Sequence, residues 1–298
     1  MIDTHAHLDF PEFDQDREEV IRRAFDNGLK AIINVGVDLE RSRKSIEIAE
    51  KHEGVFASVG LHPDFFSKAE KEFPISKSQF PNKSQILNPK FKNLIEKLKK
   101  IAMHKKTVAI GETGLDYFSH TRNAITNEQK ENQKRGFVAQ INLAHELGLP
   151  VIVHCRDAWE DAYDIIKSEI QKNKKIPNTK YQLPATKFVL HCYSGEKKDT
   201  EKFLKLPNVY FSFSGNITYP KPAERAERLA GAVRMVPLDK IVLDSDAPFL
   251  APQEMRGKRN EPIFVKYIAK KLAEIKGISE EEAEKATDEN ARKFFELE

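Results

Sequence analysis

The chain has 298 residues, of which 40% are hydrophobic and 32% are charged, and its net charge at pH 7 is +3. This composition is typical of a soluble globular protein, and the apolar runs are far shorter than the roughly 20 residues that a membrane-spanning helix needs. We therefore expect no membrane-spanning segment, and the small net charge does not by itself indicate a nucleic-acid-binding protein. Because no signal-peptide pattern precedes the first predicted strand, we expect a cytoplasmic protein.

Short apolar runs rich in β-branched residues predict eight strands. The runs are Ile2–Ala6, Ala31–Val37, Val55–Gly60, Thr107–Gly111, Val151–His154, Phe188–His191, Val209–Ser214 and Ile241–Leu243. Stretches of helical period lie between them, at Asp16–Asn27, Leu39–Glu53, Lys90–His104, Asn127–Leu147, Ala158–Lys172, Lys197–Leu206 and Ala223–Val236. Strands that alternate with helices are typical of a parallel sheet, and eight such units close into a (β/α)8 TIM barrel of about 250 residues. An open doubly wound sheet would alternate in the same way, but its glycine-rich dinucleotide motif does not follow the first strand.

Two polar stretches that contain prolines interrupt this alternation, at about residues 64–89 and 173–186. We interpret them as lysine-rich loop insertions in a single domain that spans residues 1–298. The first is longer than ordinary connections, so it is either functional or poorly ordered. Lysines near these insertions could contact the phosphates of a nucleic acid, although each lysine run is equally well explained as a solvated helix face.

Residues of metal-ligand type stand at the predicted strand ends. His5 and His7 alternate along the first strand, so their side chains project from the same face and can bind one ion together, although such a pair could also be buried and hydrogen-bonded. Further residues of this kind at later strand ends are His62, Glu112, His154, His191, Asp244 and Asp246. The carboxyl ends of barrel strands form the rim where active sites are built, so this pattern predicts a metal centre. The remaining histidines fall on predicted helices or loops and are expected to be structural or on the surface.

The number of ions is left open by the residue types. Several imidazoles with carboxylates suit zinc, manganese or a similar divalent cation, and a carboxylate such as Glu112 can bridge two of them. Two divalent ions (Mg, Mn or Zn), about 3.5–4 Å apart, would activate a water and stabilise both the attacking and the leaving oxygen of a phosphoryl displacement. One zinc held by three histidines is the alternative.

Seven motifs in a fixed order carry a family resemblance. They are DTHAHLD at Asp3–Asp9, GLHP at Gly60–Pro63, AIGETGLDY at Ala109–Tyr117, HCRDA at His154–Ala158, HCYSG at His191–Gly195, DSDAPFLAP at Asp244–Pro252 and RGKRNEP at Arg256–Pro262. Together they span nearly the whole chain, which resembles the TatD family of metal-dependent deoxyribonucleases among the amidohydrolase-like TIM barrels. The resemblance implies hydrolysis of DNA phosphodiester bonds by a metal-activated water, with a 3′–5′ exonuclease acting on single strands or 3′ ends as its most specific form.

The resemblance also implies roles for individual residues. The family's metal ligands fall on His5, His7, Glu112, His154, His191 and Asp246. By the same resemblance Glu112 bridges the two ions and Asp246 also accepts the proton of the attacking water, so both are expected to be catalytic. The family commonly has glutamate two residues before the last ligand, where this chain has Asp244. Asp244 either orients a metal ligand without itself binding the ion, or has a supporting role in which its side chain faces the barrel core.

Substrate contacts are predicted from position. They are His62, Arg156, Arg256 and Asn260. His62 could contact a phosphate or make a structural hydrogen bond, and Arg156 could bind a phosphate with two parallel hydrogen bonds. Arg256 and Asn260 lie in the loop after the last strand, where this fold often binds phosphate, although salt bridges of Arg256 and Glu261 could simply lock that loop.

Aromatic residues divide into two groups by their expected role. Trp159, Tyr210, Phe211 and Phe213 are expected to pack in the interior. Phe65 and Phe66, which directly follow GLHP, are expected to be close enough to the metals to stack on a base.

Two other functions fit the same barrel. One is hydrolysis of a different ester, such as that of aminoacyl-tRNA, because barrel and metals do not dictate the leaving group. The other is a nucleic-acid-binding barrel that has lost catalysis. The complete ligand set disfavours the second, and a glutamate in place of a carbamylated lysine on the fourth strand favours the deoxyribonuclease branch.

Overall fold

A computed structural model describes residues 1–68, 89–118, 124–174 and 185–297. Its eight strands form one parallel sheet in which each strand pairs with the next along the chain. The strands are β1 (Ile2–Ala6), β2 (Ala31–Val35), β3 (Val55–Val59), β4 (Thr107–Asp116), β5 (Val151–Arg156), β6 (Phe188–Leu190), β7 (Val209–Phe213) and β8 (Ile241–Leu243). The predicted (β/α)8 TIM barrel is confirmed.

The barrel closes where β8 and the residues after it meet β1. Ala6 and Ala247 form a parallel bridge, and the amide of His7 donates to the carbonyl of Ala247 over 2.7 Å. One strand position earlier, the amide of Asp246 donates to the carbonyl of His5 over 2.9 Å. The closure therefore brings the first predicted ligands of the chain against the last one.

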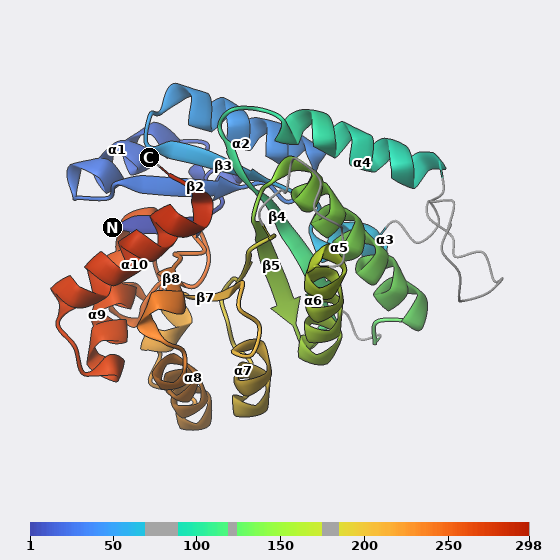
Figure 1. The fold of residues 1–298 in the computed structure, drawn as a ribbon. Coiled ribbons are helices and arrows are strands. Elements are labelled where there is room, and N and C mark those ends of the chain that lie inside the picture. The colour runs from blue at the N-terminus through green and yellow to red at the C-terminus, as the bar shows by residue number, and fades with distance from the viewer. Residues whose placement is uncertain (69–88, 119–123, 175–184, 298) are drawn as a thin grey trace.

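Ten α-helices of the described residues surround the sheet (Figure 1). They are α1 (Arg17–Asp26), α2 (Leu39–Lys51), α3 (Pro63–Lys68), α4 (Pro89–Ala102), α5 (Asn127–Leu147), α6 (Trp159–Lys174), α7 (Lys197–Phe203), α8 (Ala223–Met235), α9 (Val265–Lys276) and α10 (Glu280–Phe295). The last two follow β8 and lie beyond the helices predicted from the sequence. No helix in the described ranges is both long enough and apolar enough to span a membrane.

The two predicted insertions fall largely outside the described residues. The first was expected to begin at residue 64, but α3 occupies residues 63–68, because Pro63 supplies the preset backbone angle that favours a first helical position. The loop prediction is wrong for those residues. In the second, α6 continues to residue 174, and residues 175–184 are not described.

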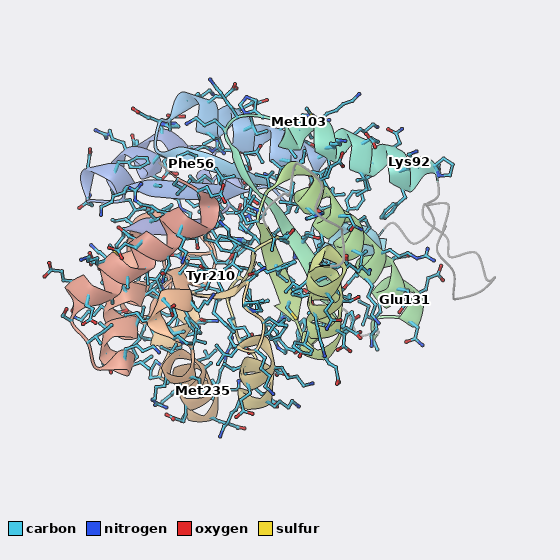
Figure 2. All side chains as sticks on the ribbon, in the orientation of Figure 1. Phe56, Lys92, Met103, Glu131, Tyr210 and Met235 are labelled. Carbon is cyan, nitrogen blue, oxygen red and sulfur yellow. The ribbon has the colours of Figure 1, made fainter. Side chains whose placement is uncertain are left out.

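The barrel interior has an apolar layer beneath its polar end. Ile152, Val189 and Val242 each stand two positions before a predicted ligand-type residue, so they share its face of the strand. These side chains belong to one buried cluster with Phe294 and Phe295 of α10 (Figure 2 shows all described side chains on the ribbon). The polar residues at the carboxyl ends of the strands thus lie above a layer of buried apolar side chains.

Candidate metal centre

The two histidines of β1 point at the same place. Their Nε2 atoms lie 3.2 Å apart. Oε2 of Glu112 lies 3.6 Å from Nε2 of His5 and 3.8 Å from Nε2 of His7. Nδ1 of His7 lies 2.9 Å from the carbonyl oxygen of Val35. Donation of the Nδ1 proton to that carbonyl leaves the Nε2 lone pair of His7 directed into the centre.

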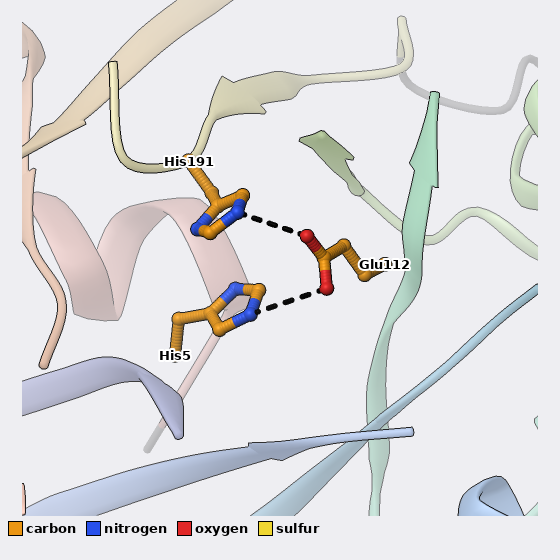
Figure 3. A group of neighbouring side chains, drawn as sticks. All are labelled: His5, Glu112 and His191. Atoms are coloured by element: carbon orange, nitrogen blue, oxygen red, sulfur yellow. Dashed lines mark ion pairs between the residues drawn. The ribbon is translucent and has the colours of Figure 1, made fainter. Parts of the chain in front are cut away.

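Glu112 stands between two pairs of histidines. Its Oε1 lies 2.7 Å from Nδ1 of His154 and 2.9 Å from Nε2 of His191, whereas Oε2 faces His5 and His7. Figure 3 shows the carboxylate with one oxygen toward His191 and the other toward His5. These two imidazoles are stacked, with ring centroids 4.0 Å apart. One carboxylate thus presents a separate oxygen to each histidine pair.

Asp246 completes the β1 side of the centre. Its Oδ1 lies 3.6 Å from Nε2 of His7, and 14% of its side chain is exposed. The residue has a φ of 55°, in the left-handed region that aspartate visits more readily than most side chains. The turn after β8 therefore aims the carboxylate at the histidines and leaves it reachable by water.

Asp244 lies behind His191. Its carboxylate accepts hydrogen bonds from the hydroxyls of Ser212 and Ser214 and, over 3.2 Å, from the amide of Cys192. Its Oδ2 lies 3.8 Å from Nδ1 of His191. Burial raises the pKa of Asp244, but the neighbouring imidazole of His191, together with the hydrogen bond from Ser212, outweighs it and lowers the pKa to about 2. Both sequence-based interpretations hold in part, since this carboxylate sits in the barrel core and contacts a predicted ligand from behind.

Asp116 was not predicted from the sequence, and its Oδ2 lies 3.2 Å from Nε2 of His154. β4 was expected to end at residue 111 but continues to Asp116, so Glu112, Gly114 and Asp116 alternate onto one face. The same period of two would have identified this aspartate. At Gly114, where φ is 144°, a Cβ atom would collide with the carbonyl oxygen of His154, so glycine permits the close approach of β4 and β5 that brings His154 to the centre.

The residues fit divalent cations. Three groups of side chains have potential ligand atoms within 4.8 Å of one another: His5, Glu112 and His191; His5, His7 and Asp246; and His62, Glu112 and His154. Two imidazole nitrogens 3.2 Å apart repel unless a proton or a cation lies between them, and imidazole with carboxylate is the donor set of zinc and manganese sites. Among the described residues, the buried Nδ1 atoms of His5 and His191 also have no hydrogen-bond partner.

Protons balance the charge of this cluster when no cation is bound. Burial lowers the pKa of His7, but the neighbouring carboxylates of Asp246 and Glu112 outweigh it and raise the pKa to about 9. Burial opposes protonation of His154 in the same way, and hydrogen bonds to Asp116 and Glu112 raise its pKa to about 9. Cations that bind these histidines must therefore displace protons.

His62 is brought to the centre beside His154. The two rings meet edge to face with centroids 4.5 Å apart, and Nε2 of His62 lies 3.9 Å from Oε1 of Glu112. Its Nδ1 accepts a hydrogen bond from the amide of Asp64 over 3.2 Å. Burial and the charge of His154 lower the pKa of His62 to about 4, so this ring is neutral. Its Nδ1 makes a structural hydrogen bond, and its Nε2 faces the centre.

The two predicted arginines are exposed and rest on aromatic rings. The guanidinium of Arg156 lies 3.6 Å from the ring centroid of Phe118, and that of Arg256 lies 4.2 Å from the ring centroid of Tyr219. The suggested locking of this loop by salt bridges is correct only for Glu261, which pairs with Arg23 and Arg259 over 3.0 Å and 3.4 Å. Arg256 forms no salt bridge with a described residue and lies over the ring of Tyr219 instead.

The prediction that Asn260 contacts substrate is wrong. Its side chain is fully buried, and Nδ2 donates to the carbonyls of Ser245 and Phe249, each over 2.6 Å. Its Oδ1 accepts from the amide of Glu261 over 2.9 Å. With all of these groups engaged, Asn260 holds together the loop that follows β8.

The predicted roles of the aromatic residues are only partly correct. Phe66 is 1% exposed and lies against Phe91 and Gly136, so it cannot stack on a base. Phe65 is half-buried and packs edge to face on Phe66. The expected packing role is confirmed for the other group, since Tyr210, Phe211 and Phe213 are buried and Trp159 packs edge to face on Tyr193.

Comparison with known proteins places this site in a family. The model of the TatD related DNase family matches residues 2–296. Over its whole length the chain is 34% identical to the uncharacterized metal-dependent hydrolase YabD of Bacillus subtilis, of which it covers 99%. It is 30% identical to the 3′-5′ ssDNA/RNA exonuclease TatD of Erwinia tasmaniensis, with 100% of both chains covered. The crystal structure of YJJV, a TatD homologue from Escherichia coli, matches with a TM-score of 0.79 and 27% identity, covering 100% of this chain and 98% of that one.

Proposed function

The chain belongs to the family of TatD related DNases and is a metal-dependent hydrolase, and from this premise we propose that it cleaves phosphodiester bonds of DNA. The observation that carries the proposal is the position of Glu112, which offers one oxygen to each of two histidine pairs. A carboxylate so placed suits two cations held side by side, which is the arrangement that serves phosphoryl displacement.

Two ions would divide the residues of the centre between them. His5, His7 and Asp246 with one oxygen of Glu112 would hold one ion, and His154 and His191 with the other oxygen would hold the second. When bound, two divalent cations (Mg, Mn or Zn) would lower the pKa of a water and neutralise charge on the phosphate.

The chain's own residues supply the remaining steps. Asp246 is the proposed base, because its partly exposed carboxylate can accept the proton of the attacking water. The water oxygen forms the new bond to phosphorus, the bond from phosphorus to the leaving sugar oxygen breaks, and the proton accepted by Asp246 passes to that leaving oxygen. Arg156 is proposed to bind a phosphate of the strand, since the ring of Phe118 holds its planar guanidinium in place. His62 is proposed to contact the phosphate from the His154 side of the centre.

In its most specific form the proposal is a 3′–5′ exonuclease that acts on single strands, as the name of the Erwinia relative states for that protein. The test uses single-stranded DNA labelled at either the 3′ or the 5′ end, with added magnesium or manganese. We expect cleavage from the 3′ end by the wild type and none by Glu112→Gln or His154→Ala. Cleavage that is unchanged in both variants would refute the assigned centre, and a wild type inert on DNA but active on aminoacyl-tRNA would point to the other ester hydrolase.

A further inference from the structure

A large aromatic side chain stands exposed at the mouth of the metal centre. Among the described residues, the exposed large hydrophobic side chains are Met103, Phe118 and Phe249, with 69%, 40% and 47% of their surface accessible. Phe249 follows Asp246 by three residues, and its ring meets the rings of His7 and Phe10 edge to face, with centroids 6.2 Å and 5.9 Å away. An exposed aromatic ring beside a catalytic centre indicates a surface that a ligand covers.

The backbone around Phe249 is fixed before any ligand arrives. The amide of Phe249 donates to the carbonyl of Asp246 over 2.8 Å, and its own carbonyl accepts from Nδ2 of the buried Asn260 over 2.6 Å. Asn260 also binds the carbonyl of Ser245, so one amide ties both sides of this turn together. Because the backbone that carries the ring is already ordered, binding of a flat partner costs little backbone freedom.

The surface of the Phe249 ring is open to a flat partner. In the described part of the chain its aromatic neighbours meet it only edge to face, and no ring or cation is stacked on it. The ring of Phe118 differs, because the guanidinium of Arg156 lies over it at 3.6 Å. Phe10 is covered as well, since His7 is stacked on it with centroids 4.7 Å apart.

We propose that Phe249 is a stacking platform for one unpaired nucleobase next to the scissile phosphate. This inference rests on the proposed function, because a phosphate bound at the centre would leave a neighbouring base within reach of the ring that lies beside His7. Every base has a π-face, so stacking of this kind tolerates any sequence, and it does not involve the sugar. A base inside a duplex is covered by its neighbours on both sides, so the platform acts on unpaired nucleotides and treats DNA and RNA alike.

The kinetic test compares Phe249→Ala with the wild type on matched single-stranded oligonucleotides. One is unmodified, and two carry an abasic sugar on either side of the cleaved bond. We expect the variant to raise KM for the unmodified strand about tenfold, which corresponds to about 1.4 kcal/mol of lost stacking. At one of the two abasic positions the difference between wild type and variant should nearly vanish, and the KM increase should be the same on DNA and RNA. Phe249→Tyr should restore most of the loss.

The control is Met103→Ala, an equally apolar exposed side chain on the outer surface of the molecule (Figure 2), for which KM should not change. Equal loss by Phe249→Ala on unmodified and both abasic strands would overturn the proposal, since the ring would then act only by supporting His7.

Contact between the Phe249 ring and a base is measured separately from turnover. An oligonucleotide with 2-aminopurine at its end is mixed with the protein, and the base fluorescence is recorded before product forms. Quenching by the wild type and none by Phe249→Ala supports the platform, and equal quenching by both overturns it. If the wild type cleaves no nucleic acid, the proposed function fails, whereas the fluorescence still decides whether the ring stacks on a base.

Discussion

Replacing Asn260 with alanine tests whether the loop after β8 is held by one buried amide. The side chain makes three hydrogen bonds, to the carbonyls of Ser245 and Phe249 and from the amide of Glu261. Each is worth about 1 kcal/mol, and leaving buried partners unpaired costs more, so the free energy of unfolding should fall by about 3 kcal/mol.

The control is Asn27→Ala, because that amide also donates to a backbone carbonyl, that of Arg23 over 2.8 Å, but does so on the surface. Its loss should cost no more than about 0.5 kcal/mol. Urea denaturation of both variants beside the wild type measures the difference. Equal stability of the two variants would refute the inference that Asn260 stabilises the loop after β8. Asn260 would then again be a candidate for substrate contact.

Three further predictions concern the centre and its supports. In EDTA, urea denaturation should show that the free energy of unfolding falls between pH 6.5 and pH 9. The pKa of His7 and of His154 is about 9 in the folded protein and 6.5 in the unfolded chain. The stability that their protonation contributes is therefore complete below pH 6.5 and is lost as the pH rises through 9. By the same protonation, metal affinity measured by calorimetry should rise over this range; an unchanged affinity would contradict it. Gly114→Ala should destabilise the protein by about 3 kcal/mol and lower the metal content found by elemental analysis. The control Gly231→Ala, at a position on α8 with open space around it, should stabilise the protein by up to about 1 kcal/mol. Equal effects of the two substitutions would mean that β4 and β5 do not need the close approach. Arg156→Ala should raise KM for oligonucleotides about tenfold and reduce the salt dependence of KM, and an unchanged salt dependence would remove this arginine from the phosphate contacts.

Much of the fold was predictable because it depends on local periodicity. The alternation of strands and helices predicted the barrel, and the two-residue period along β1 placed His5 and His7 on one face. The predicted ligands do meet at one end of the sheet, since parallel strands all present their carboxyl ends there. The helices α9 and α10 were not predicted, because helices were expected only between consecutive strands.

The side-chain environment was less predictable, because it depends on contacts between distant segments. Asn260 and Phe66 have residue types that suit substrate contact, but both are buried. Asn260 is engaged by the backbone of its own loop, whereas Phe66 packs on residues far along the chain. Phe249 stands in an ordinary-looking PFL segment, and only the tertiary structure reveals that its ring is exposed. Asp116 was overlooked for a different reason, since the predicted strand ended five residues too early.

The closure of the barrel determines when the centre can exist. The segments that meet there are about 240 residues apart in the chain, and Asp246 reaches the histidines only after β8 has docked on β1. A ribosome-bound chain therefore exposes its first two histidines long before the last carboxylate has been synthesised. It follows that a nascent or truncated product lacks the complete cation site, so the hydrolytic activity appears only when synthesis has passed the final strand.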